Sequence, residues 1–258
     1  MPKPYDTSQD LNFDALVDRF KDNVYGKLKG KIRLAVLERD FKPYIEKETL
    51  EILDVGGGQA QFSLSLAEHG HKLCINDISE KMLAVAKAKA AEKNLSSVEF
   101  VHSPLQALKE HYRQQADIVI CHAVLEWLAE PELAIPYLRD CLKKDGMLSL
   151  AFFNINSLVF RNLVRGNYRK VASNNFVGME GSLTPINPLS IETVLTWCKE
   201  NQFEVLEYSG IRVFHDYIND QAVRNRHPEA LIEMELQYSK IEPYRSLGRY
   251  IHILAKKI

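Results

Sequence analysis

Hydrophobic residues follow two alternating patterns from residue 50 onward. Short runs rich in branched side chains, typical of buried strands, occur at 50–55, 72–78, 98–103, 116–123 and 146–153. Between them, apolar residues recur at helical spacing over 59–69, 79–93, 104–111 and 131–143. Strands that alternate with helices in this way predict an α/β fold, with a mostly parallel sheet and helices on both faces.

The pattern changes toward the end of the chain. After a helix near 190–201, the stretches 203–214 and 246–258 are strand-like, and a long helical connection at 216–240 joins them. These stretches predict that the sheet ends with antiparallel strands at one edge. Residues 154–189 interrupt the alternation and are rich in Asn, Gly, Pro and basic residues. Long irregular segments of this kind are usually lids or binding loops.

Length and composition set the domain organisation. With 258 residues, of which 46% are hydrophobic, the chain can bury the core of one large domain. We expect a single domain over 1–258, with an N-terminal helical cap at 1–47 and an inserted lid or substrate segment at 154–189. The net charge of −1 indicates no bulk attraction to nucleic acid, but 19–33 and 155–190 are locally basic. Solvated basic faces are an equally good interpretation of both runs.

The cysteines and the N-terminus argue against a disulfide-rich, zinc-binding, secreted or membrane protein. The four cysteines stand singly in apolar stretches, which predicts buried reduced thiols rather than a zinc site or disulfides: Cys74, Cys121, Cys141 and Cys198. The first ten residues contain no apolar run typical of a signal peptide, and no stretch has membrane-spanning length. We therefore expect a soluble cytoplasmic protein with no metal and no membrane partner.

A glycine cluster, Gly56-Gly57-Gly58, follows the first predicted strand in "LDVGGGQAQ". Glycines at this point allow backbone N–H groups and a helix N-terminus to approach a ligand closely. Gln61 stands where a dinucleotide fingerprint has its third glycine, which argues against NAD. A plain tight turn remains the alternative.

Two acidic residues accompany these glycines. Asp77 ends the second predicted strand, nineteen residues after Gly58, where a carboxylate can accept hydrogen bonds from ribose hydroxyls. Asp54 ends the first strand and is placed to orient the glycine turn or an ammonium group. A helix cap before "SEKM" is the alternative role for Asp77. Together with the glycines, Asp77 favours an adenosine-type ligand.

"LDVGGGQAQ" followed by "INDIS" resembles class I S-adenosylmethionine-dependent methyltransferases over about residues 48–153. The resemblance implies a Rossmann-like, seven-stranded sheet with an antiparallel final hairpin and S-adenosylmethionine as cofactor. It also implies the following roles: Gly56 and Gly57 at the methionine moiety, Asp77 at the ribose, Leu105 and Gln106 at the adenine, and His122 on the sulfonium side. The family often has an acid where this chain has Gln106.

Longer strings carry a closer resemblance: "NVYGKLKGKIR", "CHAVLEWLAEP", "GIRVFHDY" and "EPYRSLGRYIHILAKK". They resemble the bacterial tRNA 5-carboxymethoxyuridine methyltransferase family from about residue 12 to 257. The family methylates the carboxylate on a modified wobble uridine and gives the methyl ester. The resemblance therefore implies a tRNA anticodon stem-loop as partner, and for Arg33 a contact to the carboxylate of the cofactor.

The implied chemistry needs little acid–base machinery. A carboxylate is ionised at neutral pH, so its attack on a methyl group needs no general base, and we expect no buried catalytic Asp–His or Glu–His dyad. The candidates for substrate positioning are Arg212, or else His215 and Tyr217, and the guanidinium fork of Arg212 matches a carboxylate well. For His215, packing of a loop histidine against Tyr217 is the alternative.

An anticodon loop would be bound by aromatic side chains that stack on bases and by cations along the phosphates. The candidates lie in two segments: Arg161, Arg165, Tyr168 and Arg169, and near the N-terminus Lys27 and Lys29. Two other functions stay open. One is a small-molecule carboxylate methyltransferase of the same fold. The other is a non-catalytic protein that binds cofactor or RNA.

Overall fold

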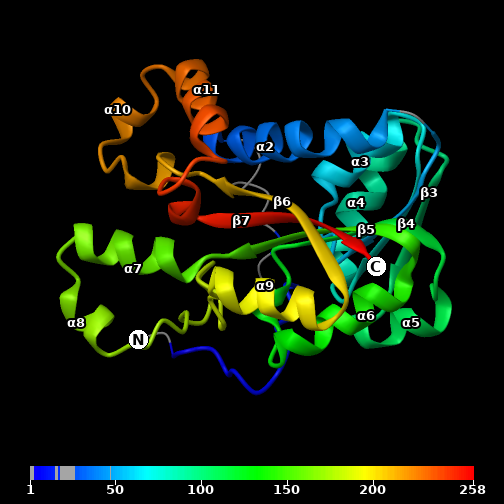
Figure 1. Cartoon of the computed structure of the whole chain (residues 1–258), viewed down its shortest axis with the longest axis horizontal. Coiled ribbons are helices and arrows are strands. Elements are labelled where there is room, and N and C mark those ends of the chain that lie inside the picture. The colour runs from blue at the N-terminus through cyan, green and yellow to red at the C-terminus, as the bar shows by residue number, and fades with distance from the viewer. Residues whose placement is uncertain (1–2, 15–16, 18–26, 47) are drawn as a thin grey trace.

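The computed structural model describes every residue except 1–2, 15–16, 18–26 and 47. Seven strands form one sheet in the order β3-β2-β1-β4-β5-β7-β6 (Figure 1). Strand β7 runs antiparallel to both of its neighbours, and all the other pairs are parallel. The strands are β1 (Glu51–Val55), β2 (Lys72–Asp77), β3 (Val98–His102), β4 (Ala116–His122), β5 (Leu142–Phe153), β6 (Phe203–Ile211) and β7 (Tyr250–Lys257).

Helices cover both faces of this sheet. In Figure 1, α2, α3 and α4 lie on one face and α5, α6 and α9 on the other, while α7 and α8 extend away from the sheet. The α-helices are α2 (Leu28–Ile45), α3 (Gln61–Glu68), α4 (Glu80–Glu92), α5 (Leu108–His111), α6 (Ala134–Cys141), α7 (Ile155–Val164), α8 (Tyr168–Ala172), α9 (Ile191–Glu200), α10 (Gln221–Arg224) and α11 (Pro228–Tyr238). Short 3-10 helices are η2 (Leu105–Ala107), η3 (Leu125–Trp127), η4 (Pro131–Leu133), η5 (His215–Tyr217) and η6 (Arg245–Leu247).

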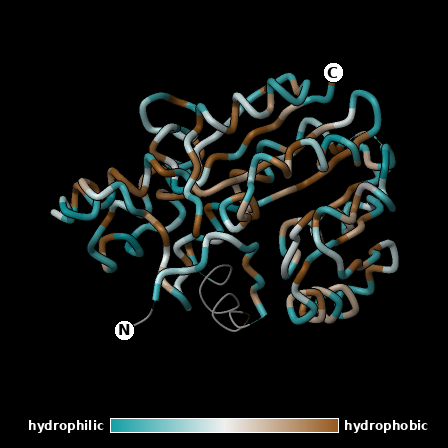
Figure 2. Tube along the Cα trace, turned by 90° about the horizontal axis from the view of Figure 1, so that it is seen from below, coloured by the Kyte–Doolittle hydropathy of each residue, from teal (hydrophilic) through white to brown (hydrophobic). Residues whose placement is uncertain are grey.

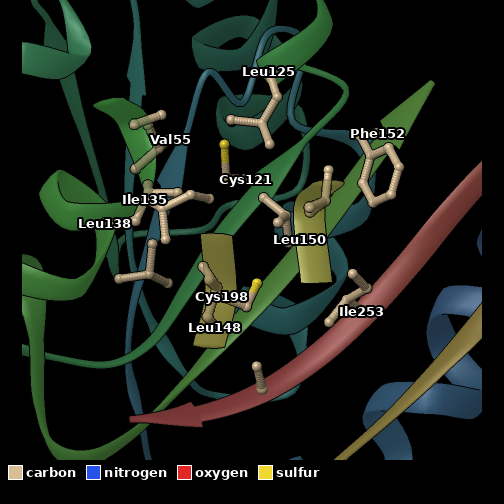
Figure 3. Packing of buried hydrophobic residues seen from close by; sticks show 14 of the residues in the cluster. Val55, Cys121, Leu125, Ile135, Leu138, Leu148, Leu150, Phe152, Cys198 and Ile253 are labelled. Carbon is tan, nitrogen blue, oxygen red and sulfur yellow. The ribbon is translucent and has the colours of Figure 1, made fainter. Parts of the chain in front are cut away.

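The sheet separates two hydrophobic cores. On one face, Leu148, Leu150 and Cys121 of the central strands pack against α6 and α9 (Figure 3). On the other face, Phe41 of α2 and Leu83 of α4 pack over the same sheet. Figure 2 shows the apolar positions concentrated along the interior strands and the polar positions on the outer turns. A sheet covered on both faces explains the nearly continuous apolar runs of the sequence.

The seven-stranded sheet with its antiparallel edge is confirmed, but three element boundaries differ from the sequence prediction. Strand β5 begins at Leu142, four residues earlier than expected. The stretch 104–111 is a 3-10 turn followed by a single turn of α-helix, after Pro104 has fixed an extended conformation. The predicted connection at 216–240 consists of η5, α10 and α11.

The segment 154–189 is more regular than its composition predicts. Asn154 caps α7, because its side chain accepts a hydrogen bond from the Asn156 N–H at 3.0 Å. The same side chain donates to the carbonyl oxygens of Ser246 and Gly248 at 2.9 and 2.8 Å. This buried amide therefore anchors α7 to the end of the sheet.

The sequence predicted no disulfide, no metal site and no membrane-spanning segment, and the structure bears on each of these features. All four cysteines are free, and three of them are buried. Among the described residues, no group of three or more His, Cys, Asp or Glu side chains is placed to hold a metal ion. In the same part of the chain, no helix is both long enough and apolar enough to cross a bilayer.

Candidate active site

The glycine turn lies at the carboxyl end of β1, between the ends of β2 and β4. Gly56 and Gly58 have φ angles of +65° and +57°, a region that favours glycine. A Cβ on Gly56 would lie 2.4 Å from a methyl carbon of Val124. The turn thus requires glycine for its conformation as well as for space.

Asp54 lies directly beside this turn. A Cβ on Gly57 would lie 2.6 Å from its Oδ2 atom, and the same oxygen accepts a hydrogen bond from Ser63 Oγ at 2.5 Å. Burial raises the pKa of Asp54 to about 7, although the bond from Ser63 opposes the shift. Of the two roles predicted for Asp54, its position corresponds to support of the glycine turn.

Asp77 joins the second strand to the same turn. Its Oδ2 accepts from the Gly58 N–H at 2.8 Å, and its Oδ1 accepts from the Ser79 N–H at 2.7 Å. Burial raises the pKa of Asp77, and these two backbone hydrogen bonds oppose the shift. The N-cap of α4 is Ser79 and not Asp77, because the Ser79 hydroxyl accepts from the Met82 N–H, and the ligand-binding role of Asp77 stays a prediction.

These elements line one cavity, here called the central cavity. It is bounded by the glycine turn, by Asp77, by the end of β4 and by the N-terminal segment: Leu11, Phe13, Arg33, Gly56, Gly57, Gly58, Gln59, Asp77, Met82, His122, Ala123, Val124, Trp127 and Leu128. Arg33, Gly56–Gly58, Asp77 and His122, all predicted as cofactor residues, are thus brought together. The close backbone approach at the turn, next to a carboxylate, fits an adenosine-containing ligand.

Residues 3–14 cover part of the central cavity, a role that the sequence does not reveal. The Leu11 N–H donates to the carbonyl oxygen of Trp127 at 3.0 Å. The rings of Tyr5 and Phe13 contact Trp127 edge-on, with centroids 6.2 and 4.8 Å away. Aromatic residues near an N-terminus carry no periodic signal, so only the fold shows what they cover.

Leu105 and Gln106, predicted to contact adenine, do not line the central cavity. Leu105 is buried in the core beneath α6. Gln106 Nε2 donates to Asp10 Oδ2 at 3.2 Å, and both residues line a neighbouring pocket that shares Leu128 with the central cavity. The segment lies next to the cavity, and its contact to adenine stays a prediction.

A second, strongly basic pocket opens beside the central cavity and is here called the arginine pocket. Arg33 lines both. Its walls are Lys29, Gly30, Arg33, Phe153, Arg161, Leu183, Arg212, His215, Asp216, Arg224, Arg249 and Tyr250. Asp216 is the one acidic residue in this lining, against six lysine and arginine side chains. Such a lining favours an anionic ligand.

Asp216 organises part of this charge. His215 Nδ1 lies 2.8 Å from Asp216 Oδ1, and the Arg212 and Arg249 nitrogens lie 3.4 and 3.6 Å from Oδ2. Burial alone would raise the pKa of Asp216, but Arg212, His215 and Arg249 together hold it well below its usual value. One carboxylate thus orients three basic side chains.

Two other donor atoms in this pocket make no hydrogen bond within the described part of the chain. Arg249 is nearly buried, and within the described residues its Nη1 atom makes no hydrogen bond. Burial lowers the pKa of Arg249 to about 10. The Nε atom of Arg161 is likewise buried without an acceptor among the described residues. Unpaired buried donors are costly, so an anionic ligand would satisfy them.

The three predicted positioning residues differ in their placement. Arg212 has φ +62°, which turns its side chain into the pocket, where the guanidinium lies 5.3 Å from the Tyr250 ring centroid. His215 lines the pocket against Asp216, not against Tyr217. Tyr217 does not line it, since its hydroxyl lies 2.6 Å from the Leu247 carbonyl oxygen and 2.9 Å from Ser157 Oγ.

The absence of a catalytic Asp–His dyad stays a prediction, but buried Asp–His pairs do occur in the structure. In addition to His215 and Asp216, His252 Nδ1 lies 2.9 Å from Asp40 Oδ2, and both side chains are about 1% exposed. The two partners are separated by more than 200 positions in the chain. Only the packing of α2 onto β7 brings them together, so no local sequence motif could have predicted the pair.

The predicted RNA-binding residues fall into two groups. Lys29 and Arg161 line the arginine pocket, and burial, followed by the neighbouring Arg212, lowers the pKa of Lys29. Arg165, Tyr168 and Arg169 are exposed on α7, α8 and their connection. Lys27 is exposed just before α2, and residues 18–26 of the N-terminal basic run lie outside the described residues.

Comparison with known proteins agrees with this geometry. The profile of the methyltransferase-domain family matches residues 53–150. The chain is 36% identical over 253 residues to "tRNA 5-carboxymethoxyuridine methyltransferase" of Escherichia coli strain K12, covering 96% of this chain and 97% of that protein. A solved structure from Pyrococcus horikoshii superposes with a TM-score of 0.64 at 17% identity and covers 93% of this chain and 98% of that one.

A second solved structure is the magnesium protoporphyrin IX methyltransferase of Synechocystis with SAH bound. Its TM-score is 0.61 at 16% identity, and the match covers 95% of this chain and 96% of that chain. At this level of identity, both structural matches support the fold.

The raised pKa of Asp54 predicts a pH dependence of stability. Its native pKa of about 7 exceeds the ordinary value of 3.8, so Asp54 stabilises the fold most fully below about pH 4, and this is lost as the pH rises through 7. Asp54→Asn should therefore gain stability relative to the wild type by on the order of 2–3 kcal/mol between about pH 5 and pH 8. Urea unfolding across this range measures the difference.

Asp145→Asn is the control. Asp145 is exposed, and its hydrogen bond and ion pair with Lys256 lower its pKa below the ordinary value of 3.8, so this variant should differ from the wild type by a constant amount between about pH 5 and pH 8. A constant difference between Asp54→Asn and wild type at every pH would contradict the assignment.

Proposed function

The chain belongs to the S-adenosylmethionine-dependent methyltransferases, in the family of the tRNA 5-carboxymethoxyuridine methyltransferase, and we propose that it methylates the carboxylate of 5-carboxymethoxyuridine at the tRNA wobble position. The product would be the methyl ester. The observation that carries the proposal is the arginine pocket, with its unpaired buried donors, beside the central cavity.

S-adenosylmethionine is the cofactor of this family, and the central cavity has the groups to hold it. The glycine turn leaves space for close backbone approach, and Asp77 can accept hydrogen bonds from ribose hydroxyls. Arg33 lies on the side shared with the arginine pocket, where a guanidinium can pair with the carboxylate of the methionine moiety. When bound, the cofactor supplies an electrophilic methyl group on a sulfonium.

The arginine pocket supports a carboxylate nucleophile. Arg212 and Arg249 can orient the anion through planar guanidinium groups, and Asp216 keeps both side chains in place. The nucleophile is already ionised at neutral pH, so the pocket has to position it and to remove its water rather than to take a proton. We assign Arg212 and His215 to substrate positioning, whereas Tyr217 holds η6 and α7 behind the pocket.

The arm formed by α7 and α8 supports a substrate much larger than a metabolite. It carries apolar and aromatic side chains that are unusually exposed for their type: Phe160, Leu163, Val164 and Tyr168. Arg165 and Arg169 lie among them on the surface. Aromatic rings interleaved with cations are suited to unstacked bases and phosphates of an anticodon loop. We therefore assign 154–189 to substrate binding. We assign α2, the helix of the predicted N-terminal cap, to the wall of the central cavity, which Arg33 lines.

A small carboxylate metabolite is the second candidate substrate, because the arginine pocket would accept it equally well. Transfer of labelled methyl groups separates the candidates. Bulk tRNA carrying 5-carboxymethoxyuridine should be methylated, whereas tRNA without this nucleoside and a small-molecule extract should not. Methylation of the extract alone would support the metabolite, and no transfer to any acceptor would support a non-catalytic binding protein.

Asp77→Asn should weaken S-adenosylmethionine binding. It keeps the shape of the side chain but removes the charge from its hydrogen bonds, which should cost about 1.5–3 kcal/mol of binding free energy. Isothermal calorimetry measures the loss. The control is Asp117→Asn near the amino end of the central strand β4, where the carboxylate also accepts a backbone N–H, that of Glu51, at 2.9 Å. Normal affinity in folded Asp77→Asn would refute the cofactor assignment.

Arg212→Lys should lower kcat more than it raises KM for tRNA. Lysine keeps the charge but loses the planar two-point contact, so the carboxylate would still bind but in poorer orientation, with a rate loss of roughly tenfold or more. Steady-state kinetics on modified tRNA measure both constants. Arg245→Lys is the control, because Arg245 stacks on Tyr208 outside the pocket. An increase of KM with unchanged kcat would show that Arg212 attracts the substrate carboxylate but does not orient it.

Arg165→Gln combined with Arg169→Gln should raise KM for tRNA and leave cofactor affinity unchanged. The loss of two phosphate contacts should reduce the slope of log affinity against log salt by about one to two. Binding titrations at several salt concentrations measure this slope. Arg113→Gln with Lys144→Gln removes the same charge from exposed positions away from the arm and serves as the control. Equal changes of KM and of salt dependence in both double variants would show that the RNA-binding surface does not lie on α7 and α8.

A further inference from the structure

The arginine pocket holds more positive charge than one substrate carboxylate needs. Its lining has six lysine and arginine side chains and a single acid, Asp216. Under the proposed function, Arg33 can pair with the carboxylate of the cofactor, and Arg212 with Arg249 can orient that of the substrate. Together with Asp216, these two anions compensate three of the six positive charges, so three remain. Cations that stay uncompensated in a partly buried site repel one another and attract a further anion.

Two of the remaining cations, Arg161 and Arg224, lie close together although they belong to separate elements. Arg161 is on α7, Arg224 ends α10, and both line the pocket. Burial lowers the pKa of Arg161, and neighbouring cations, Arg224 among them, lower it further. The third remaining cation is Lys29, whose pKa is lowered by burial and then by Arg212. Lys29 therefore belongs to the group around Arg212, and Arg161 and Arg224 form a pair of their own.

Direct contacts hold α7 against the segment that leads into α10. The rings of Phe160 and Tyr217 meet edge-on, with centroids 5.1 Å apart. Further along α7, Arg165 Nε and Nη2 each lie 3.3 Å from Asn219 Oδ1. Arg161 lies between these two contacts in the sequence of α7. The fold itself therefore fixes the position of Arg161 relative to α10.

Both guanidinium groups have donors that a ligand can use. Arg224 donates from Nε and Nη2 to the carbonyl oxygen of Ile218 at 3.0 and 2.7 Å, which fixes the plane of the group and leaves Nη1 outside this contact. The buried Nε of Arg161 has no acceptor within the described part of the chain. Planar groups with several N–H donors match phosphate as well as carboxylate. The pair thus offers the charge and the donors that a phosphate requires.

The modified nucleotide carries a second anion in a suitable place. In a pyrimidine nucleotide whose base has the usual anti orientation, the base edge with C5 and C6 lies over the 5′ side of the ribose. A carboxymethoxy group on C5 and the 5′-phosphate of the same nucleotide therefore lie on one side of the molecule, whereas the 3′-phosphate lies away from them. One pocket can bind the carboxylate and the 5′-phosphate together.

We propose that Arg161 and Arg224 form a second anion subsite in the arginine pocket, which binds the 5′-phosphate of the nucleotide that is methylated. The inference rests on the proposed function and makes it more specific, because the unit bound inside the pocket is then a nucleotide with two anions and not a nucleoside. A small carboxylate metabolite without phosphate would occupy only the part of the pocket around Arg212 and Arg249.

Anticodon stem-loops with one altered phosphate test the subsite. Each carries 5-carboxymethoxyuridine at the wobble position and a neutral methylphosphonate on either the 5′ or the 3′ side of this nucleotide. The measured quantity is KM for transfer of labelled methyl groups, with the unaltered stem-loop as reference. The 5′ methylphosphonate should raise KM about tenfold, because it loses a contact between charged groups, and the 3′ methylphosphonate should raise it by less than about twofold.

Arg161→Gln combined with Arg224→Gln should remove this sensitivity. The double variant should have a raised KM for the unaltered stem-loop, and the 5′ methylphosphonate should raise that value by less than about twofold. Arg169→Gln with Lys170→Gln removes the same charge from exposed positions on α8 and is the control. The control should keep the tenfold ratio of KM between the 5′-substituted and the unaltered stem-loop.

Three results would overturn the inference. The first is an equal KM of the wild type for the unaltered and the 5′-substituted stem-loop, which does not depend on the folding of any variant. The second is a tenfold ratio that persists in the folded double variant, because other residues would then bind the phosphate. The third is a larger effect of the 3′ methylphosphonate. No methylation of the unaltered stem-loop would instead refute the proposed function.

Discussion

Strand β7 forms hydrogen-bonded ladders with β5 on one side and with β6 on the other, and the positions of both binding regions depend on this double ladder. Its first residue, Tyr250, brings a ring between the guanidinium groups of Arg33 and Arg212, with centroid distances of 5.2 and 5.3 Å. Two residues later, and therefore on the same face of the sheet, the His252 ring contacts the Ser149 hydroxyl, which also contacts His122. One antiparallel strand thus supports both the arginine pocket and the central cavity.

Charge is distributed unevenly between these two regions. The central cavity combines one acidic side chain, Asp77, with the backbone of the glycine turn and the side chains of Arg33, Gln59 and His122, and the rest of its lining is mostly apolar. The arginine pocket concentrates cations around the single carboxylate of Asp216. Like charges held close together in a partly buried site repel one another, and so this arrangement reduces stability in the empty protein. Arg33 lies at the boundary between the central cavity and the arginine pocket, where its guanidinium can pair with an anionic group of a ligand in either one.

The sequence predicted the framework well because the framework is periodic and local. Apolar runs placed the strands to within a few residues, and glycine chemistry placed the turn beside Asp77. Family resemblance then pointed to Arg212 and His215, which the fold brings into one pocket with Arg249. The composition of 154–189 was misleading, because Asn and Gly suggested an irregular loop, whereas Asn154 in fact caps a helix.

What the sequence missed depends on pairs that are distant along the chain. Asp40 and His252 come together only when α2 packs on β7, and Leu11 and Phe13 cover the cavity only because of their contacts with Trp127. Arg249 could not be distinguished from other surface-like cations until its burial was known. Local patterns report on secondary structure, whereas these residues owe their roles to tertiary packing.

The unpaired donor of Arg249 has a consequence for the release of product. Under the proposed function, esterification would convert an anion into a neutral group, so the ligand that satisfied this donor would lose its charge at the moment of transfer. Arg249 and the neighbouring Arg212 would then face an ester with weak acceptors, and their mutual repulsion would be restored. Such a pocket would bind the carboxylate more tightly than the ester and would thereby favour release of the product.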